Sequence, residues 1–164
     1  MKKAAFTLLL ALTTIMASAQ GTLKKVYDET INPMEQIDRA IEDIRATGAN
    51  KFIVCQIGGN WCPWCLLFAD FVSRDTDIMK VINDNYLYLH VNYNPRKGNA
   101  ENATALMKRL GSPQRFGFPV FVILDGNGKV LHIQDSSFLE EGKGYDKEKV
   151  LRFLKAWTPE AVRN

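Results

Sequence analysis

The sequence is poor in the residue types that build metal sites and disulfide frameworks. Its 164 residues include three cysteines and two histidines. A structural zinc site needs about four ligands, and His90 and His132 are not spaced as a ligand pair. We therefore predict no metal site and a structural role for both histidines. The length suffices for one domain to bury a core without disulfide cross-links.

The sequence also lacks a strong excess of either charge. It contains 21 basic and 18 acidic residues, and 19 basic residues remain without Lys2 and Lys3 near the N-terminus. A nearly neutral balance argues against nucleic acids and anionic membrane surfaces as partners. The sequence also has no internal repeat and no low-complexity tract.

Long hydrophobic runs are limited to one, at the N-terminus. Lys2 and Lys3 precede an apolar run over residues 4–16, and Ala17-Ser18-Ala19 follows it. This order is typical of a secretory signal peptide over residues 1–19, and the run is too short to span a bilayer. We therefore expect an exported protein, in the bacterial periplasm or secreted, without stable membrane insertion after cleavage.

Against this background, two of the three cysteines form a motif, Cys62-Pro63-Trp64-Cys65. An apolar run, KFIVCQI, and two glycines precede it, and an amphipathic run, LLFADFV, follows it. A Cys-x-x-Cys pair between a strand and a helix is typical of a thiol–disulfide exchange site. The helix N-terminus favours a thiolate on Cys62, the predicted nucleophile, and Pro63 fits the first turn. Cys65, one turn later, is the predicted resolving thiol.

Two alternatives remain open for the cysteines. Cys62 and Cys65 could form a purely structural disulfide, although so short a loop stabilises a fold little. Cys55 lies inside the apolar run over residues 51–57 and is left without a partner. We favour a buried, inert core thiol there, with a redox role as the alternative.

Hydrophobic periodicity and turn residues predict an α/β fold with a central mixed sheet and helices on both faces. A lead-in over residues 20–31 precedes one domain, 32–158, and a tail, 159–164. The predicted elements are a helix between Asn32 and Gly48, strand 51–57, helix 63–74, a short helix 78–83, strand 86–91, loop 92–99, helix 100–110, hairpin strands 120–124 and 129–134, polar loop 136–144 and helix 146–157.

Over residues 32–157 the sequence resembles the thioredoxin superfamily. The matching features are Trp61-Cys62-Pro63-Trp64-Cys65 after a buried strand, Phe118-Pro119 before a late strand, and the Asp125-Gly126-Asn127-Gly128 turn. The stretch Gly142-Lys143-Gly144-Tyr145-Asp146 looks like that of exported thioredoxin-like proteins of bacterial envelopes. The resemblance implies a thioredoxin-like fold in which Pro119 is in cis beside the cysteines.

The resemblance also implies a substrate groove. Trp61 would pack against the cysteine helix and shield the site, and Trp64 would offer an exposed apolar surface to an extended partner. Phe118 and Pro119 would form the other wall, where backbone groups bind a peptide as a strand does. Core packing is the alternative for both tryptophans.

Two positions depart from thioredoxin. The family's buried acid, six residues before the first cysteine, is replaced by Gln56, which cannot titrate. The dipeptide between the cysteines is Pro-Trp, which is closer to glutaredoxin. Gln56 and Pro63 are therefore predicted to be structural components of the site.

We conclude from the sequence that the chain is an exported thiol–disulfide oxidoreductase, acting more as a reductase. Its partners would be cysteine-containing proteins and an upstream thiol donor or acceptor. It would work as a monomer with no cofactor besides the Cys62–Cys65 disulfide. The alternatives are a glutathione-linked enzyme and a non-enzymatic peptide-binding module of the same fold.

Overall fold

A computed structural model describes residues 23–94, 96 and 100–163. The predicted signal peptide lies outside these residues, as does part of the predicted loop 92–99. Across the described ranges, no helix is long and apolar enough to cross a membrane.

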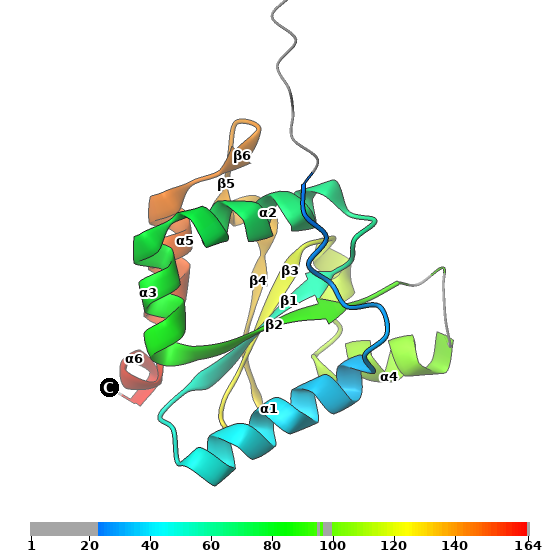
Figure 1. Ribbon diagram of the computed structural model, residues 1–164, viewed down its shortest axis with the longest axis vertical. Helices are drawn as coiled ribbons and strands as arrows, with labels where there is room; N and C mark the ends of the chain where they lie inside the picture. The colour runs from blue at the N-terminus through cyan, green and yellow to red at the C-terminus, as the bar shows by residue number, and fades with distance from the viewer. Residues whose placement is uncertain (1–22, 95, 97–99, 164) are drawn as a thin grey trace, which may run out of the picture.

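The centre of the fold is a four-stranded mixed sheet in the order β2-β1-β3-β4 (Figure 1). Its strands are β1 (Phe52–Gly58), β2 (Tyr86–Asn92), β3 (Val120–Leu124) and β4 (Val130–Asp135). β1 pairs in parallel with β2 and antiparallel with β3, and β3 and β4 form the antiparallel hairpin. The predicted mixed sheet is confirmed.

Helices cover both faces of this sheet, as predicted (Figure 1). One face carries α1 (Pro33–Thr47) and α4 (Ala100–Arg109), and the other carries α2 (Pro63–Arg74), α3 (Thr76–Asn85) and α5 (Lys147–Ala156). Because side chains alternate along a strand, Ile53, Cys55 and Ile57 pack toward α1 and α4. Gln56 therefore points the other way, toward α2.

Capping residues explain where the helices begin. The side chain of Asn32 accepts a hydrogen bond from the Met34 amide at 3.0 Å, as the sequence predicts. Asp75 accepts from the amides of Asp77 and Ile78 at 3.0 Å each, which starts α3 earlier than the predicted residue 78. The missed signal was Asp75, a preferred N-cap residue.

The prediction of a polar loop over residues 136–144 is wrong. It contains a 3-10 helix, η2 (Ser136–Leu139), and a small hairpin of β5 (Glu140–Glu141) and β6 (Gly144–Tyr145). Leu139 and Tyr145 are buried and pack beside α5, which orders the intervening polar residues. A further short helix, α6 (Pro159–Arg163), occupies the segment predicted as a tail.

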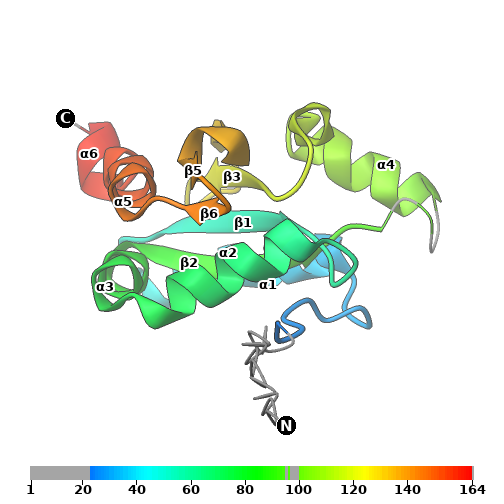
Figure 2. The same cartoon turned by 90° about the horizontal axis from the view of Figure 1, so that it is seen from above.

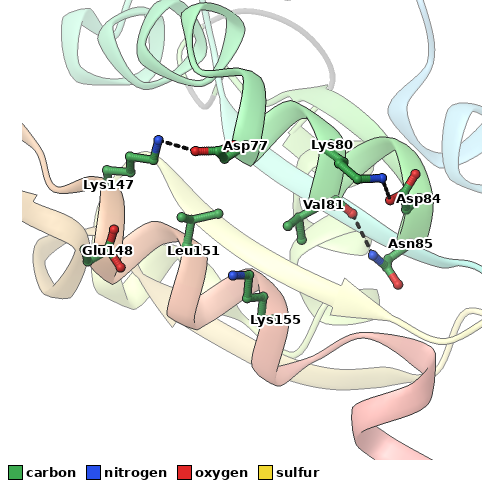
Figure 3. Close-up of a pocket in the computed structure, with 9 residues that line it drawn as sticks. All are labelled: Asp77, Lys80, Val81, Asp84, Asn85, Lys147, Glu148, Leu151 and Lys155. Atoms are coloured by element: carbon green, nitrogen blue, oxygen red, sulfur yellow. Dashed lines mark hydrogen bonds and ion pairs between the residues drawn. The ribbon is translucent and has the colours of Figure 1, made fainter.

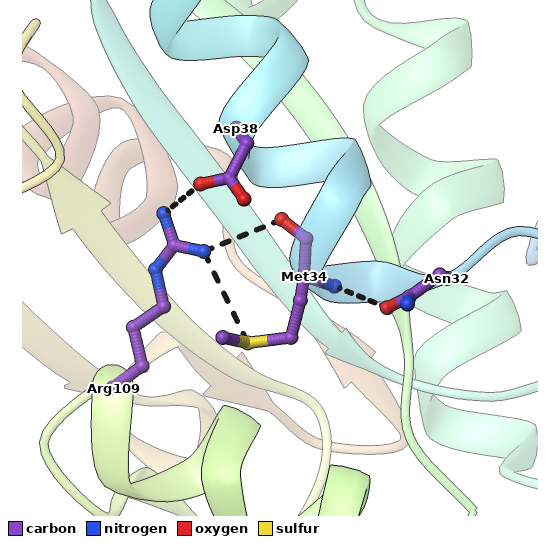
Figure 4. A network of polar contacts seen from close by, with 4 residues as sticks. All are labelled: Asn32, Met34, Asp38 and Arg109. Carbon is purple, nitrogen blue, oxygen red and sulfur yellow. Dashed lines mark hydrogen bonds and ion pairs between the residues drawn. The ribbon is translucent and has the colours of Figure 1, made fainter.

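Cys55 belongs to the core between the sheet and the α1–α4 layer, where it is fully buried. Burial raises the pKa of the Cys55 thiol to about 12, with a smaller opposing effect from the Arg109 charge. Arg109 ties α4 to α1 through Asp38 at 2.6 Å and the Met34 carbonyl at 3.3 Å (Figure 4). The prediction that Cys55 is a buried core thiol is therefore confirmed.

The phenylalanines provide a test of the core. Phe121 is fully buried in β3, with its ring centroid 4.4 Å from Phe68, whereas Phe138 is 73% exposed. We expect Phe121→Ala to lower the free energy of unfolding by about 3–5 kcal/mol and Phe138→Ala to change it by less than about 0.5 kcal/mol. Urea denaturation of the oxidised proteins measures both, and equal losses would contradict the assigned core.

Cys55 can be tested separately because the other two cysteines are joined in a disulfide. Iodoacetamide added to the folded, oxidised protein should leave Cys55 unmodified, since the thiolate is the reactive species and is disfavoured by burial. In urea without reductant, one thiol per chain should react. Mass spectrometry reads both results, and rapid alkylation of the folded protein would contradict the burial of Cys55.

Candidate active site

The cysteine pair lies at the N-terminus of α2. Cys62 is the N-cap residue, Pro63 opens the first turn, and the Cys65 amide points to Cys62 Sγ at 3.2 Å. Cys62 and Cys65 are joined by a disulfide, with their Cα atoms 5.2 Å apart. The predicted pairing and the predicted strand-to-helix junction are both confirmed.

The two cysteines differ in burial. Cys62 keeps 5% of its surface exposed, whereas Cys65 is completely buried. Across from Cys62, the Phe118–Pro119 peptide bond is in cis, as the resemblance implied. The Phe118 carbonyl oxygen lies 3.7 Å from Cys62 Sγ. Of the two cysteines, Cys62 is thus the one at the protein surface.

Exposed aromatic side chains lie beside the disulfide. Trp61 and Trp64 are 46% and 37% exposed, so neither is a core residue. Trp61 meets Phe118 edge to face at 5.6 Å, and its indole N–H donates to the Tyr93 carbonyl at 2.9 Å. Tyr93 stacks on Phe118 at 5.2 Å. Sequence reasoning left Tyr93 unassigned because nothing local links it to residues so distant in the chain.

Trp64 is supported from β6. Its ring meets the Tyr145 ring edge to face at 5.6 Å, and the Tyr145 hydroxyl donates to the Trp64 carbonyl at 3.2 Å. Tyr145 belongs to the stretch 142–146, which resembles exported envelope proteins, and it packs against the start of the cysteine helix α2. Of the predicted site residues, the structure gathers Trp61, Trp64, Phe118 and Pro119 around the disulfide.

Gln56 lies behind the cysteines and is fully buried. Its amide nitrogen donates to the Cys65 carbonyl at 2.9 Å and to the Tyr27 hydroxyl at 2.7 Å. Its amide oxygen accepts from the Tyr88 hydroxyl at 2.6 Å. A carbonyl can only accept, so the amide nitrogen must face Cys65. The position of thioredoxin's acid is thus occupied by a neutral amide with its hydrogen bonds satisfied.

Tyr27 is the main site residue that sequence reasoning missed. The segment before α1 passes beside the loop that leads into α2 (Figures 1 and 2). Asn60 of that loop accepts from the Val26 and Tyr27 amides at 3.2 and 3.1 Å and donates to the Tyr27 carbonyl at 2.7 Å. Tyr27 is 4% exposed and packs with Cys62 and Cys65. An aromatic residue within the polar lead-in was the available signal.

Three ionisable side chains, Tyr27, Tyr88 and His90, lie in the buried layer behind the disulfide. Burial raises the pKa of Tyr27 and of Tyr88 well above the ordinary value for a phenol. Burial also lowers the pKa of His90, whose ring meets both tyrosine rings edge to face. The layer behind the disulfide is therefore neutral near pH 7.

A cavity of about 570 Å³ lies elsewhere, between α3 and α5 (Figure 3). Four of its charged lining residues form two ion pairs: Lys147 contacts Asp77 at 2.6 Å and Lys80 contacts Asp84 at 2.7 Å. It contains neither cysteine nor any predicted site residue. In the part of the chain that the structure describes, no group of three His, Cys, Asp or Glu side chains could hold a metal.

Comparison with known proteins agrees with this geometry. A family model described as a thioredoxin-like domain matches residues 37–135, which is more than half of the chain. None of the curated proteins matches the chain.

Two solved structures are similar in fold. One is the disulphide isomerase from Xylella fastidiosa Temecula1, with a TM-score of 0.65 and 22% identity over 82% of this chain and 97% of that chain. The other is described as DsbH oxidoreductase, with a TM-score of 0.51 and 19% identity over 73% and 79%. The sheet, the cysteine helix and the matched domain lead to one conclusion: the chain belongs to the thioredoxin-like domain family.

Proposed function

We propose that this protein is a thiol–disulfide oxidoreductase that acts on cysteine-containing proteins. The observation that carries the proposal is the pair of unequal sulfurs at the start of α2. Cys62 keeps 5% of its surface exposed next to two exposed tryptophans, and Cys65 is completely buried one turn behind it. A purely structural disulfide has no need for such an asymmetry or for exposed tryptophans beside it.

In the reducing direction, an upstream dithiol donor first supplies two electrons and two protons to the Cys62–Cys65 disulfide. The Cys62 thiolate then attacks a substrate disulfide, and one substrate sulfur leaves as a thiolate that takes up a proton. Cys65 next attacks Cys62 Sγ and releases the second substrate sulfur. The products are a substrate dithiol and the restored disulfide, and no further cofactor takes part.

Two features support Cys62 as the attacking sulfur. The Cys65 amide donates to Cys62 Sγ at 3.2 Å, and the positive end of the α2 helix dipole lies at the same residue. Both effects stabilise a thiolate. Trp61 and Phe118 flank the sulfur and would contact the apolar residues of an extended substrate.

We propose reduction as the direction and a monomer exported through residues 1–19 as the working form. The support is the thioredoxin-like Trp-Cys-x-x-Cys motif and the signal-peptide layout of the N-terminus. One structural neighbour is described as a disulphide isomerase, which makes isomerisation the competing activity.

The roles of the cysteines can be tested with insulin. Cys62→Ala should abolish the dithiothreitol-dependent reduction of insulin disulfides, because no other accessible sulfur can attack. Cys65→Ala should accumulate a mixed disulfide on Cys62, which mass spectrometry detects. Cys55→Ala is the matched control and should retain activity, since Cys55 lies on the opposite face of the sheet. Undiminished turnover by Cys62→Ala would remove Cys62 as the nucleophile.

The direction can be tested by redox titration of the Cys62–Cys65 pair. For a reductase we expect a potential closer to the thioredoxin value of about −270 mV than to the strong oxidant value of about −120 mV. Tryptophan fluorescence in glutathione or dithiothreitol buffers measures it. A potential near −120 mV would exclude the reductive direction, and reactivation of scrambled ribonuclease would instead support isomerisation.

A further inference from the structure

Tyr27 places a hydroxyl group in the buried layer behind the disulfide. Its ring packs with Cys62, Cys65 and Leu66, and Asn60 holds its backbone to the loop that precedes Cys62. A residue of the segment before α1 is thereby fixed in the same unit as the two reacting sulfurs.

In the part of the hydrogen-bond network around Gln56 that the structure describes, the hydroxyl proton of Tyr27 has no acceptor. Both amide protons of Gln56 are engaged, one by the Cys65 carbonyl and one by the Tyr27 oxygen. Its amide oxygen is occupied by the Tyr88 hydroxyl. Tyr27 therefore accepts from Gln56, and its own O–H proton has no acceptor among the described residues. A buried donor without an acceptor is uncommon in proteins.

Gly58, at the end of β1, lies between this donor and the cysteine helix. A Cβ atom on Gly58 would stand 3.0 Å from the Tyr27 hydroxyl oxygen and closer still to Cys65 Sγ. Both groups therefore approach the same point beside Gly58, and the absence of a side chain at residue 58 is what lets them come so close. The Tyr27 hydroxyl and the Cys65 sulfur are thus neighbours with no other described side chain between them at this point.

From this placement we propose that Tyr27 donates a hydrogen bond to the Cys65 sulfur when that sulfur becomes a thiolate. The proposal rests on the exchange function proposed above and deepens it. Gln56 cannot accept a proton from Cys65, because an amide does not titrate. Tyr27 would instead stabilise the Cys65 thiolate through a hydrogen bond.

The step that Tyr27 assists is the resolution of the mixed disulfide. Cys65 loses its proton to solvent, and its thiolate attacks Cys62 Sγ while the bond between Cys62 and the substrate sulfur breaks. The substrate sulfur leaves with the electron pair and takes a proton from solvent, so charge and atoms balance. Tyr27 keeps its proton throughout and is a donor, not a base.

The surroundings of Tyr27 favour this protonated role. Burial raises the pKa of Tyr27, and the hydrogen bond from Gln56 offsets only part of that rise. The titratable groups that face it are Tyr88 and His90 of β2, Tyr145 of β6 and the two cysteines of α2. The hydroxyls of Tyr88 and Tyr145 already donate to the Gln56 amide oxygen and the Trp64 carbonyl, so they are engaged elsewhere. Burial lowers the pKa of His90, which disfavours a charged imidazolium beside the thiolate.

The test uses Tyr27→Phe in the reduced, full-length mature chain, with dithiobis-nitrobenzoate as the probe. Attack by Cys62 releases one coloured thiolate, and resolution by Cys65 releases a second, so stopped-flow absorbance separates the two steps. We expect Tyr27→Phe to slow the second step by about tenfold to a hundredfold, the factor for one hydrogen bond to a charged group. The first step should change by less than about twofold.

Tyr86→Phe is the matched control, because it removes another buried phenol whose hydroxyl donates to the Leu154 carbonyl. Both steps should stay within about twofold of wild type in that variant. An unchanged second step in Tyr27→Phe would overturn the proposal. So would equal slowing of both steps, since that indicates a general distortion.

A second measurement decides the proposal without any turnover. In a Cys62→Ala background, carbon-13 NMR of the cysteine Cβ atoms follows the titration of Cys65 separately from that of Cys55. Tyr27→Phe should raise the titration midpoint of Cys65 by about one to two pH units. An unmoved midpoint would overturn the proposal even if the wild-type protein reduces insulin. A raised midpoint in a protein that reduces no disulfide would instead contradict only the proposed function.

Discussion

The hydrogen bonding of one buried amide, that of Gln56, holds the cysteine site together. A buried amide that loses its partners costs about 1–3 kcal/mol, so the groups around it must remain in place. Those groups come from three segments: the Cys65 carbonyl from α2, Tyr88 from β2, and Tyr27 from the chain before α1. The start of the cysteine helix is therefore fastened to the sheet and to the N-terminal segment at one point.

This fastening accounts for the difference between the two sulfurs. The hydrogen bond from Gln56 to the Cys65 carbonyl holds Cys65 in the buried layer. Cys62 is the N-cap residue and lies at the edge of that layer, beside Phe118. The layer itself is neutral. A carboxylate at position 56 would have to be desolvated to fit there, whereas an amide fills the position without carrying a charge. The site thus places Cys62 at the edge of the buried layer and Cys65 inside it, as the proposed exchange reaction requires.

Much of the fold could be predicted because its signals are local. Helix 63–74 and strand 120–124 have the predicted bounds, since each combines a clear periodicity with a nearby Pro or Gly. Segments with weak periodicity were predicted poorly. Residues 136–144 read as a polar loop because their order depends on Leu139 and Tyr145 packing against distant elements. α3 was predicted too short because Asp75 was not recognised as its cap.

The sequence by itself determined the motif residues of the candidate site: two cysteines one helical turn apart, a proline that fits the first turn, and a Phe-Pro pair before a late strand. These follow from neighbouring residues and from backbone geometry. Only the tertiary structure decided which residues stand behind the sulfurs. Tyr27 and Tyr88 reach Gln56 from 29 and 32 positions away, and Tyr93 meets Trp61 across 32 positions. Such pairs depend on which polar groups are buried together when the sheet and helices close, and local sequence does not encode that choice.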